Sequence, residues 1–212
     1  MKPYVMLVAG GSASGKSTVV DEVLERAGLE DVIILKQDDY YHDQKDIPLD
    51  KRRLMNYDHP ASLDNTLLKT HLEALIEGQP IEKPLYDFVN HTRSTSTQKI
   101  VPKNIIIVEG ILVLYDASIR ALSDLNIYVE LDDDTRFIRR MLRDLNERGR
   151  TLENIIEQYQ STVKPMFHAF IRPTKRYADI LIPNDSKHDI AVDLIVAKLD
   201  QYRRSLKREQ RL

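Results

Sequence analysis

The feature that most constrains the fold is a glycine-rich segment between a short apolar run and a helical pattern. Residues 10–17 read GGSASGKS, which fits the pattern G-x-x-x-x-G-K-[ST]. The apolar run Tyr4 to Ala9 before it predicts a strand buried on both faces, and Lys16 to Ala27 after it has apolar residues at helical spacing. A strand, a tight loop and a helix in this order predict the start of an α/β domain that wraps a loop around phosphate groups.

Four further β-branched runs alternate with helical stretches along the chain. They are Asp31 to Lys36, Asn104 to Val108, Leu125 to Leu131 and Ala178 to Ile182. This alternation predicts a three-layer α/β sandwich of the P-loop NTPase type, with a five-stranded parallel sheet. The length of 212 residues suits one domain, whose ligands are expected at the carboxyl ends of the strands.

One segment, Pro80 to Pro102, breaks the alternation. It has two extended-looking halves around a polar centre at Thr92 to Gln98, which predicts a β-hairpin inserted before the strand at 104–108. We call residues 80–102 the flap.

Composition narrows the expected surroundings and partners. The net charge of -2 gives no global attraction to nucleic acid, and the absence of cysteine excludes disulfides and thiolate metal sites and fits a reducing compartment. The first apolar run is too short for a signal-peptide core. The longest apolar stretch, Ile105 to Tyr115, carries Glu109 and is shorter than the ~20 residues a bilayer requires. We therefore expect a cytoplasmic protein that binds neither nucleic acid nor membrane.

The glycine-rich segment predicts how a nucleotide would be held. Glycines let the backbone curl so that successive N–H groups point at phosphate oxygens, and the helix adds its positive N-terminal end. Lys16 is expected to reach the β- and γ-phosphates, and Ser17 to ligate Mg²⁺. The alternative is a glycine-rich turn that only starts a helix. The predicted nucleotide-binding residues are Gly10, Gly11, Ser12, Ala13, Ser14, Gly15, Lys16, Ser17 and Thr18.

Acidic residues follow two of the predicted strands. Asp38 and Asp39 come after the second run, where either could accept a proton from a hydroxyl being phosphorylated or ligate Mg²⁺. The alternative is a solvated acidic turn. Glu109 ends the strand at 104–108 in an apolar setting, where a carboxylate is costly unless paired or bound to metal. This position favours a role near Mg²⁺ or its waters.

The segment Asp132 to Arg150 contains six arginines. For most of them a solvated helix face with i,i+4 pairs is the simpler interpretation. Arg136, Arg140 and Arg143 share one face, however, and Arg148-Gly149-Arg150 lies where the helix would break. A mobile turn carrying two arginines could close over the phosphates, so we predict a lid at about residues 144–152.

Beyond the glycine-rich segment, the chain carries NYDHP at Asn56 to Pro60, PLYDFVNHTR at Pro84 to Arg93 and RDLNERGR at Arg143 to Arg150. In combination, these segments resemble the uridine kinase family, also called uridine–cytidine kinases. The resemblance runs in order from near the start of the chain to about Pro183. The P-loop alone names a superfamily; the combination of the YDHP, YDFVNHTR and RDLNERGR segments is much more specific. The matching segments are GGSASGKST at Gly10 to Thr18, QDDYY at Gln37 to Tyr41, NYDHP at Asn56 to Pro60, PLYDFVNHTR at Pro84 to Arg93, VEGIL at Val108 to Leu112, RDLNERGR at Arg143 to Arg150, VKPMF at Val163 to Phe167 and PTKRYADILIP at Pro173 to Pro183.

The resemblance implies roles for individual residues. Asp38 would be the base facing the ribose 5′-hydroxyl, and Asp58 would hold the ribose hydroxyls. Tyr86, Phe88 and His91 of the flap would line the base pocket, with His91 at the polar edge of uracil or cytosine. Arg140 and Gln158 are implied as further nucleoside contacts, and Arg143, Arg148 and Arg150 as phosphate and lid residues. Ser17 and Glu109 would lie around Mg²⁺, which Asp38 could also ligate.

Apart from the resemblance, these residues have plainer interpretations. Tyr86 and Phe88 alternate along a strand and could be core residues, and His91 could be an ordinary hairpin histidine. Asp58 could form a turn, and Gln158 could face solvent on its polar helix.

This chain departs from the family at one position. The family often has serine after the catalytic aspartate, whereas this chain has Asp39. Like charges perturb each other's pKa, so a second carboxylate bears on the assignment of the base.

As a whole, the resemblance implies transfer of the γ-phosphoryl of ATP or GTP to uridine or cytidine with Mg²⁺, giving UMP or CMP, in a homotetramer. One alternative keeps the chemistry and changes the acceptor, as in the related phosphoribulokinase and pantothenate kinase groups. Another is a nucleotide-dependent switch or a nucleic-acid-binding module. Against these stand the absence of an N-K-x-D guanine signature and the mixing of the arginines with acids.

Overall fold

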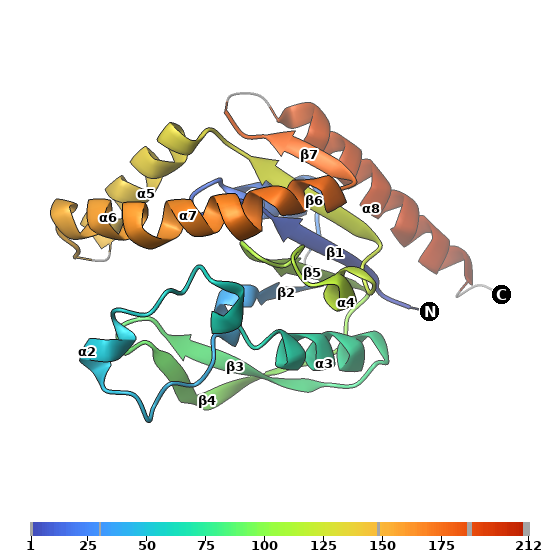
Figure 1. Cartoon of the computed structure of the whole chain (residues 1–212). Helices are drawn as coiled ribbons and strands as arrows, with labels where there is room; N and C mark the ends of the chain where they lie inside the picture. Colours follow the sequence, from blue (N-terminus) through green and yellow to red (C-terminus); the bar gives the residue numbers. More distant parts are fainter. Residues whose placement is uncertain (1, 30, 148, 186–187, 210–212) are drawn as a thin grey trace.

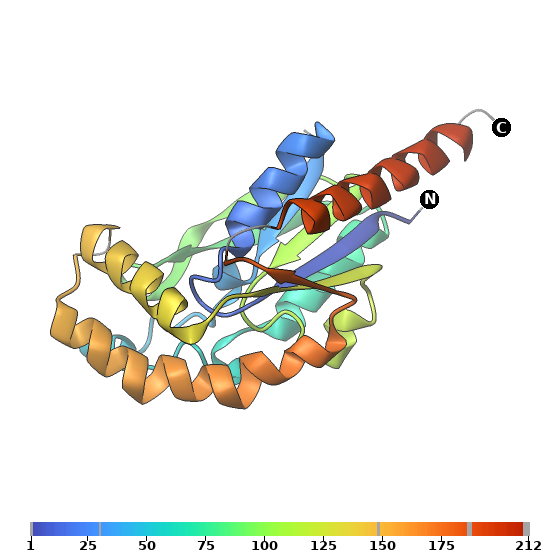
Figure 2. The same ribbon diagram turned by 90° about the horizontal axis from the view of Figure 1, so that it is seen from above.

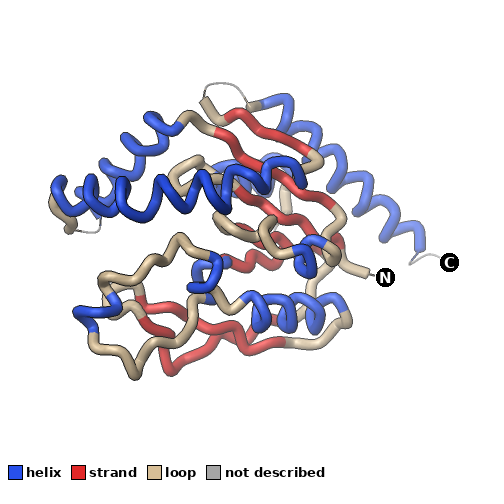
Figure 3. Tube along the Cα trace, viewed as in Figure 1, coloured by secondary structure: helices blue, strands red, loops and turns tan. Residues whose placement is uncertain are grey.

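The structure, a computed structural model, describes residues 2–29, 31–147, 149–185 and 188–209. Within these ranges, one parallel sheet of five strands has the order β2-β5-β1-β6-β7 (Figures 1 and 3). The predicted parallel sheet is confirmed, with each strand end within two residues of its expected place. The strands are β1 (Tyr4–Ala9), β2 (Val32–Lys36), β5 (Ile105–Glu109), β6 (Leu125–Glu130) and β7 (Ile180–Pro183).

Helices cover both faces of this sheet, which makes the three layers that the sequence predicts. The helices α1 (Lys16–Ala27) and α8 (Asp189–Glu209) lie side by side on one face, as seen from above in Figure 2. The other face is covered by α3 (Asn65–Ile76), α4 (Ala117–Arg120) and the 3-10 turn η1 (Gln37–Tyr40).

The alternation of side chains along β1 explains why this strand reads as continuously apolar. Val5 and Leu7 pack into the cluster that contains α3, whereas Met6 and Val8 pack into the cluster that contains α1 and α8. A strand between two helical layers has no solvent-facing side, so every position selects an apolar residue. β1 is accordingly buried along its whole length.

The flap is an antiparallel pair, β3 (Ile81–Asp87) and β4 (Thr92–Ile100), that lies with α2 (Leu49–Arg52) below the sheet in Figure 1. The hairpin prediction is confirmed, but its centre at Thr92 to Gln98 is wrong. The turn spans 88–91, where Asp87 Oδ1 accepts bonds from the backbone N–H groups of Val89 and Asn90 at 2.9 and 3.0 Å. The polar run belongs to β4, which is largely exposed and therefore needs no apolar residues.

The register of the flap shifts between Pro84 and Tyr86, as a β-bulge does. Lys83 and Tyr86 are both buried, although they lie three positions apart. In a regular strand, residues three apart point to opposite faces.

The arginine-rich segment forms α5 (Asp133–Glu147), which ends before Gly149, as predicted. A long helical stretch follows: α6 (Leu152–Gln158), a π-helical turn at Tyr159–Val163, α7 (Lys164–Met166) and a second π-helical turn at Phe167–Ile171. It runs across the sheet above the flap in Figure 1. Among the helices of the described residues, none has the length and apolar character needed to cross a bilayer.

Candidate active site

The site is built around the loop of residues 10–15 between β1 and α1. Gly10, Ala13 and Gly15 have φ angles of 149°, 61° and 87°, a left-handed region that favours glycine. A Cβ at Gly10 would lie 2.4 Å from the carbonyl oxygen of Val129, and one at Gly15 would lie 2.1 Å from Nδ2 of Asn184. The loop is therefore curled tightly against the ends of β6 and β7, where only glycine fits.

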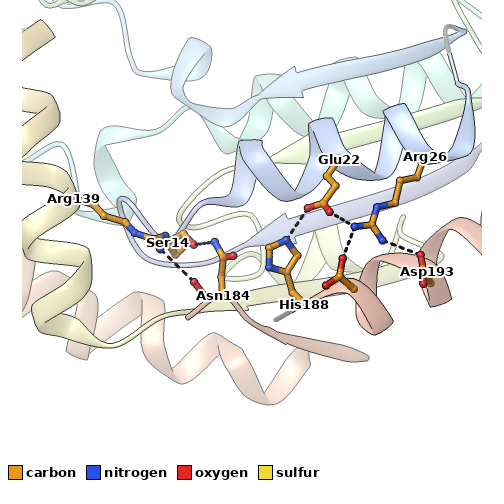
Figure 4. Close-up of polar contacts among 8 residues, drawn as sticks. Ser14, Glu22, Arg26, Arg139, Asn184, His188 and Asp193 are labelled. Atoms are coloured by element: carbon orange, nitrogen blue, oxygen red, sulfur yellow. Dashed lines mark hydrogen bonds and ion pairs between the residues drawn. The ribbon is translucent and has the colours of Figure 1, made fainter. Parts of the chain in front are cut away.

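The segment after β7 holds this loop from outside. Asn184 Nδ2 donates to the backbone oxygen of Ser14 at 2.7 Å, and Arg139 donates to the backbone oxygen of Asn184 at 3.5 Å (Figure 4). Nearby, His188 contacts Glu22 at 2.7 Å, which joins the start of α8 to α1. Asn184 could not be predicted from the motif, because the motif is local and this contact spans 170 positions.

The loop carries a fully buried hydroxyl, Ser14, and is followed by an ammonium group, Lys16, that is bonded to the loop backbone. The Ser14 hydroxyl is buried, and among the described residues it has no hydrogen-bond partner. Lys16 Nζ donates to the backbone oxygens of Gly10 and Gly11 at 3.0 and 3.2 Å. Burial lowers the pKa of Lys16, opposed by the nearby carboxylates of Asp38 and Glu109.

A cavity of about 390 Å³ opens in front of this loop. It brings together predicted residues that lie far apart in the sequence: Ser12, Ala13 and Gly15 of the loop with Lys16 to Thr18, Asp38 on η1, Glu109 at the end of β5, Phe88 of the flap and Arg143 of α5. Gly10, Gly11 and Ser14 do not line it. Its lining does not include Asp58, Tyr86 or His91, which lie in the neighbouring region between the flap and the arginine segment.

The oxygen donors beside this cavity fit a magnesium ion carried in with a nucleotide. Ser17 Oγ donates to the Glu109 carboxylate at 2.9 Å, and Lys36 lies 4.0 Å from the same carboxylate. Within the ranges that the structure describes, no three His, Cys, Asp or Glu residues are grouped closely enough to hold a metal. Mg²⁺ in phosphate sites takes one or two protein ligands and completes its shell with phosphates and water, so this donor set suits it.

Asp39, the residue that departs from the family pattern, has a partner that the sequence analysis missed. Its carboxylate forms an ion pair with Lys83 of β3, whose side chain is buried. Asp39 lines the same cavity as Asp38.

The implied nucleoside residues lie in and beside an aromatic cluster. His91 stacks on Tyr57 with ring centroids 5.1 Å apart, and Tyr86 packs against Tyr41 and Phe88 at 5.1 and 5.2 Å. Tyr86 is buried, as the core interpretation of its spacing expects, whereas Phe88 is 52% exposed. The aromatic cluster therefore presents one exposed ring, Phe88, at the edge of the cavity.

Asp58 is 8% exposed, and its carboxylate accepts no hydrogen bond that the described residues supply. Burial raises the pKa of Asp58, and the positive charge of Arg140 opposes this shift. An ionised carboxylate in such a place is costly until a ligand provides donors.

Two of the three arginines that share one face of α5 are buried, whereas Arg139 is exposed, as a solvated face requires. Arg136 and Arg140 are 3% and 7% exposed. The Arg136 guanidinium lies 3.7 Å above the Phe167 ring and would meet any Cβ at Gly11. Their burial follows from the helical stretch after residue 152, which covers α5; periodicity within α5 alone could not reveal that cover.

Arg140 connects the loop to this covering stretch. It donates to Ser12 Oγ at 2.9 Å and to Gln158 Oε1 at 3.0 Å. Gln158 also accepts from Arg150, so it faces inward, against the interpretation of a solvent-facing side chain.

Asp144, for which no role was predicted, is fully buried, and its carboxylate lies among Arg140 and Arg143 of α5 and Arg150 of the predicted lid. Its Oδ1 accepts from Arg143 at 2.9 Å, and its Oδ2 lies 3.6 Å from Arg140 and 3.8 Å from Arg150. Of the remaining predicted lid residues, Arg148 lies outside the described residues.

Comparison with solved structures identifies the fold. Phosphoribulokinase from Rhodobacter spheroides superposes with a TM-score of 0.66 at 19% identity, covering 86% of this chain and 70% of that one. D-glycerate 3-kinase from Cryptococcus neoformans superposes with a TM-score of 0.63 at 16% identity, covering 89% and 88%. Both are kinases with a nucleotide-binding α/β fold, and at these identities the likeness concerns the fold alone.

Sequence comparison is far closer. A protein named uridine kinase from Ligilactobacillus salivarius is 50% identical over 93% of each chain, and one from a Geobacillus species is 52% identical over 93% of this chain and 94% of its own. A third, from Clostridium perfringens, is 50% identical over 94% and 96%. The family model described as Phosphoribulokinase / Uridine kinase family matches residues 5–191. With its phosphate loop, strand-end acids and arginine segment in one site, the chain belongs to the phosphoribulokinase and uridine kinase family of P-loop kinases.

Proposed function

We propose that this kinase transfers the γ-phosphoryl of ATP, or of GTP, to the 5′-hydroxyl of uridine or cytidine and so serves pyrimidine salvage. The observation that carries the acceptor assignment is the buried Asp58 carboxylate, which lacks a hydrogen-bond donor from the described residues and lies close to Asp38. A ribose supplies adjacent hydroxyl donors for such a group. Relatives about 50% identical carry the name uridine kinase.

The phosphate donor would occupy the loop of residues 10–18. The loop's N–H groups would receive phosphate oxygens, and Lys16 would exchange its bonds to Gly10 and Gly11 for the β- and γ-phosphates. Ser17 would hold Mg²⁺, with the carboxylates of Glu109 and Asp38 beside it. Bound there, Mg²⁺ neutralises charge that develops on the phosphates.

Asp38 would accept the proton of the acceptor hydroxyl as that oxygen attacks the γ-phosphorus. It lies on η1 at the carboxyl end of β2, in the cavity that Lys16 and Arg143 also line. Phosphoryl transfer depends mainly on positioning and electrostatics, so the placement of this carboxylate is its main contribution.

The base would lie against Tyr86 and Phe88, with His91 at its polar edge and Arg140, Arg150 and Gln158 around it. Burial and the neighbouring Arg150, Arg53 and Arg52 lower the pKa of His91. The imidazole therefore stays neutral at pH 7 and can donate one hydrogen bond and accept another. Both uracil and cytosine can use such a pair.

The lid, at about residues 144–152, would supply arginines to the transferring phosphoryl group. We propose this role for Arg143, Arg148 and Arg150, with Asp144 holding two of them, Arg143 and Arg150, before the nucleotide arrives. We also propose a single domain over residues 1–212 that acts in the cytoplasm as a homotetramer, on the strength of the family resemblance.

The acceptor can be tested directly. We expect uridine and cytidine to give the highest kcat/KM in an assay of ADP release with uridine, cytidine, adenosine, ribulose 5-phosphate and pantothenate. The product should be the nucleoside 5′-monophosphate by chromatography. Higher activity with ribulose 5-phosphate or pantothenate would overturn the pyrimidine assignment while leaving the kinase class in place.

Replacing the proposed base should separate chemistry from binding. We expect Asp38→Asn to lower kcat by about 10²- to 10⁴-fold, because a general base contributes about that much. Affinity for a non-hydrolysable ATP analogue, measured by calorimetry, should change little. Asp46→Asn, an exposed acid nearby, serves as the matched control. Turnover of Asp38→Asn close to that of the unmodified chain would exclude the base role.

Asp58 should show opposite effects on ligand binding and on stability. Because burial raises the folded-state pKa of Asp58, its ionisation costs folding free energy at every pH above that pKa. Asp58→Asn should therefore raise or preserve the melting temperature of the ligand-free protein at pH 7. Uridine affinity should fall by about tenfold or more, since hydrogen bonds to a charged group contribute about 1.5–3 kcal/mol. Asp50→Asn on α2 is the exposed control. A lower melting temperature together with unchanged uridine affinity would contradict this assignment.

Asp144 should matter more to stability than a comparable surface acid. We expect Asp144→Asn to lower the free energy of unfolding by about 3–5 kcal/mol, because it leaves buried arginine charge uncompensated. Urea unfolding measures this. Asp200→Asn, which breaks the half-exposed pair with Arg203, should cost about 1 kcal/mol or less. Equal costs for the two variants would mean that the arginines do not depend on Asp144.

A further inference from the structure

A lysine lies buried at the base of the flap, where the strand pattern calls for an apolar residue. Lys83 is 6% exposed and lies two positions after the buried Ile81 of β3. Burying an ammonium group costs several kcal/mol unless it is paired. The packing of a two-stranded flap does not require such a residue, so its burial calls for a specific partner.

That partner is Asp39, on the same turn as the proposed base. The Lys83 ammonium donates to Asp39 Oδ2, and 44 positions separate the two residues. Both members of the pair have little solvent exposure, with the Asp39 side chain at 15%. The pair therefore joins the flap to η1 at a point where water screens the charges weakly.

The rest of η1 is fixed by neutral contacts to the body of the domain. Gln37 accepts from the backbone N–H of Leu112 at 3.0 Å and donates to Asn65 at 3.2 Å. The Tyr40 hydroxyl lies 3.1 Å from Nδ1 of His71. Gln37 and Tyr40 thus anchor the two ends of the turn, and the ion pair of Asp39 acts on its middle, directly beside Asp38.

The pairing of Asp39 with Lys83 affects which carboxylates in the cavity can bind a metal ion or the acceptor. Asp39 lines the same cavity as Asp38. An unpaired Asp39 carboxylate there would compete with Asp38 for a metal ion or for the acceptor hydroxyl. An ammonium contact occupies Asp39 and offsets its charge. The charged residues that line this cavity are Lys16, Lys36, Asp38, Asp39, Glu109 and Arg143.

We propose that Lys83 is a positioning residue for phosphoryl transfer: from β3 it engages Asp39, and it thereby fixes the part of η1 that carries Asp38 and keeps Asp39 away from the metal and the acceptor hydroxyl. The inference rests on the proposed function for the identity of the acceptor. It explains how this chain accommodates a second carboxylate beside its base.

A charge-removal cycle tests this inference. Lys83→Met should lower kcat by about 10- to 100-fold, because a small misplacement of a reacting group costs that much, while the KM for ATP stays within about twofold. The Mg²⁺ concentration for half-maximal activity should also shift, since Asp39 is then available as a ligand. The double variant Asp39→Asn/Lys83→Met should restore the Mg²⁺ dependence and recover part of the lost kcat, because position 39 no longer carries a carboxylate that competes for the metal. The loss of kcat that remains measures how far the ion pair fixes η1.

Two controls separate positioning from loss of structure. Lys99→Met changes an exposed lysine of the same flap and should alter nothing. Kinetic values are divided by the active fraction, taken from the stoichiometry of ATP-analogue binding. If Lys83→Met does not fold, the activities of the double variant and of Lys83→Arg test the role of Lys83 instead. The proposal expects both variants to be active, and inactivity of both would contradict it.

The role of Lys83 would be overturned if the losses of kcat from Asp39→Asn and from Lys83→Met simply add in the double variant. It would also be overturned if the kcat of Lys83→Met lies within twofold of that of the unmodified chain. The identity of the acceptor does not affect this test, because the variants at positions 39 and 83 are assayed with whichever acceptor gives the highest kcat/KM in the assay of ADP release. Absence of uridine phosphorylation would contradict the proposed function, and loss of coupling between positions 39 and 83 would contradict only this inference.

Discussion

The site depends on the close approach of the Gly10–Gly15 loop to the backbone at the end of β6. At Gly10 the loop comes so near the Val129 carbonyl that a single added carbon would collide with it. The absence of a side chain at Gly10 permits this approach, and the curled loop brings the start of α1 to the cavity that Lys16 and Ser17 line. Lys16 and Ser17 project from the first turn of that helix, so their positions follow from the same constraint.

A second principle concerns charge. Around the cavity lie buried charged side chains, each of which would cost free energy of folding if it had no partner. Lys83 is paired with Asp39, and Asp144 is paired with arginines. Paired charges can be buried at moderate cost, whereas single ones cannot. Asp58 differs, because its carboxylate accepts no hydrogen bond from the described residues, and only the charges of Arg140, Arg143 and Arg150 oppose the effect of its burial. We interpret this difference as the distinction between residues that hold the site and a residue that receives the ligand.

Local patterns predicted the parts of the fold that local physics determines. Strand β1, helix α1 and the loop between them have the predicted bounds, because glycine tolerance and apolar periodicity act over a few residues. The pairing of Asp39 with Lys83 and the burial of Arg140 depend on which segments come together in space. No periodicity within one segment carries that information. The flap turn was misplaced for a related reason: an exposed edge strand such as β4 has no apolar face to mark it.

The β-bulge between Pro84 and Tyr86 changes which face of β3 the following side chains occupy. Before it, Lys83 pairs with Asp39 on η1; after it, Tyr86 packs in the aromatic cluster, and a regular strand would turn one of the two outward. The number of residues between positions 83 and 86 is therefore as constrained as their chemistry. Loop grafts or deletions that alter specificity should leave this spacing intact and change the turn at 88–91 instead.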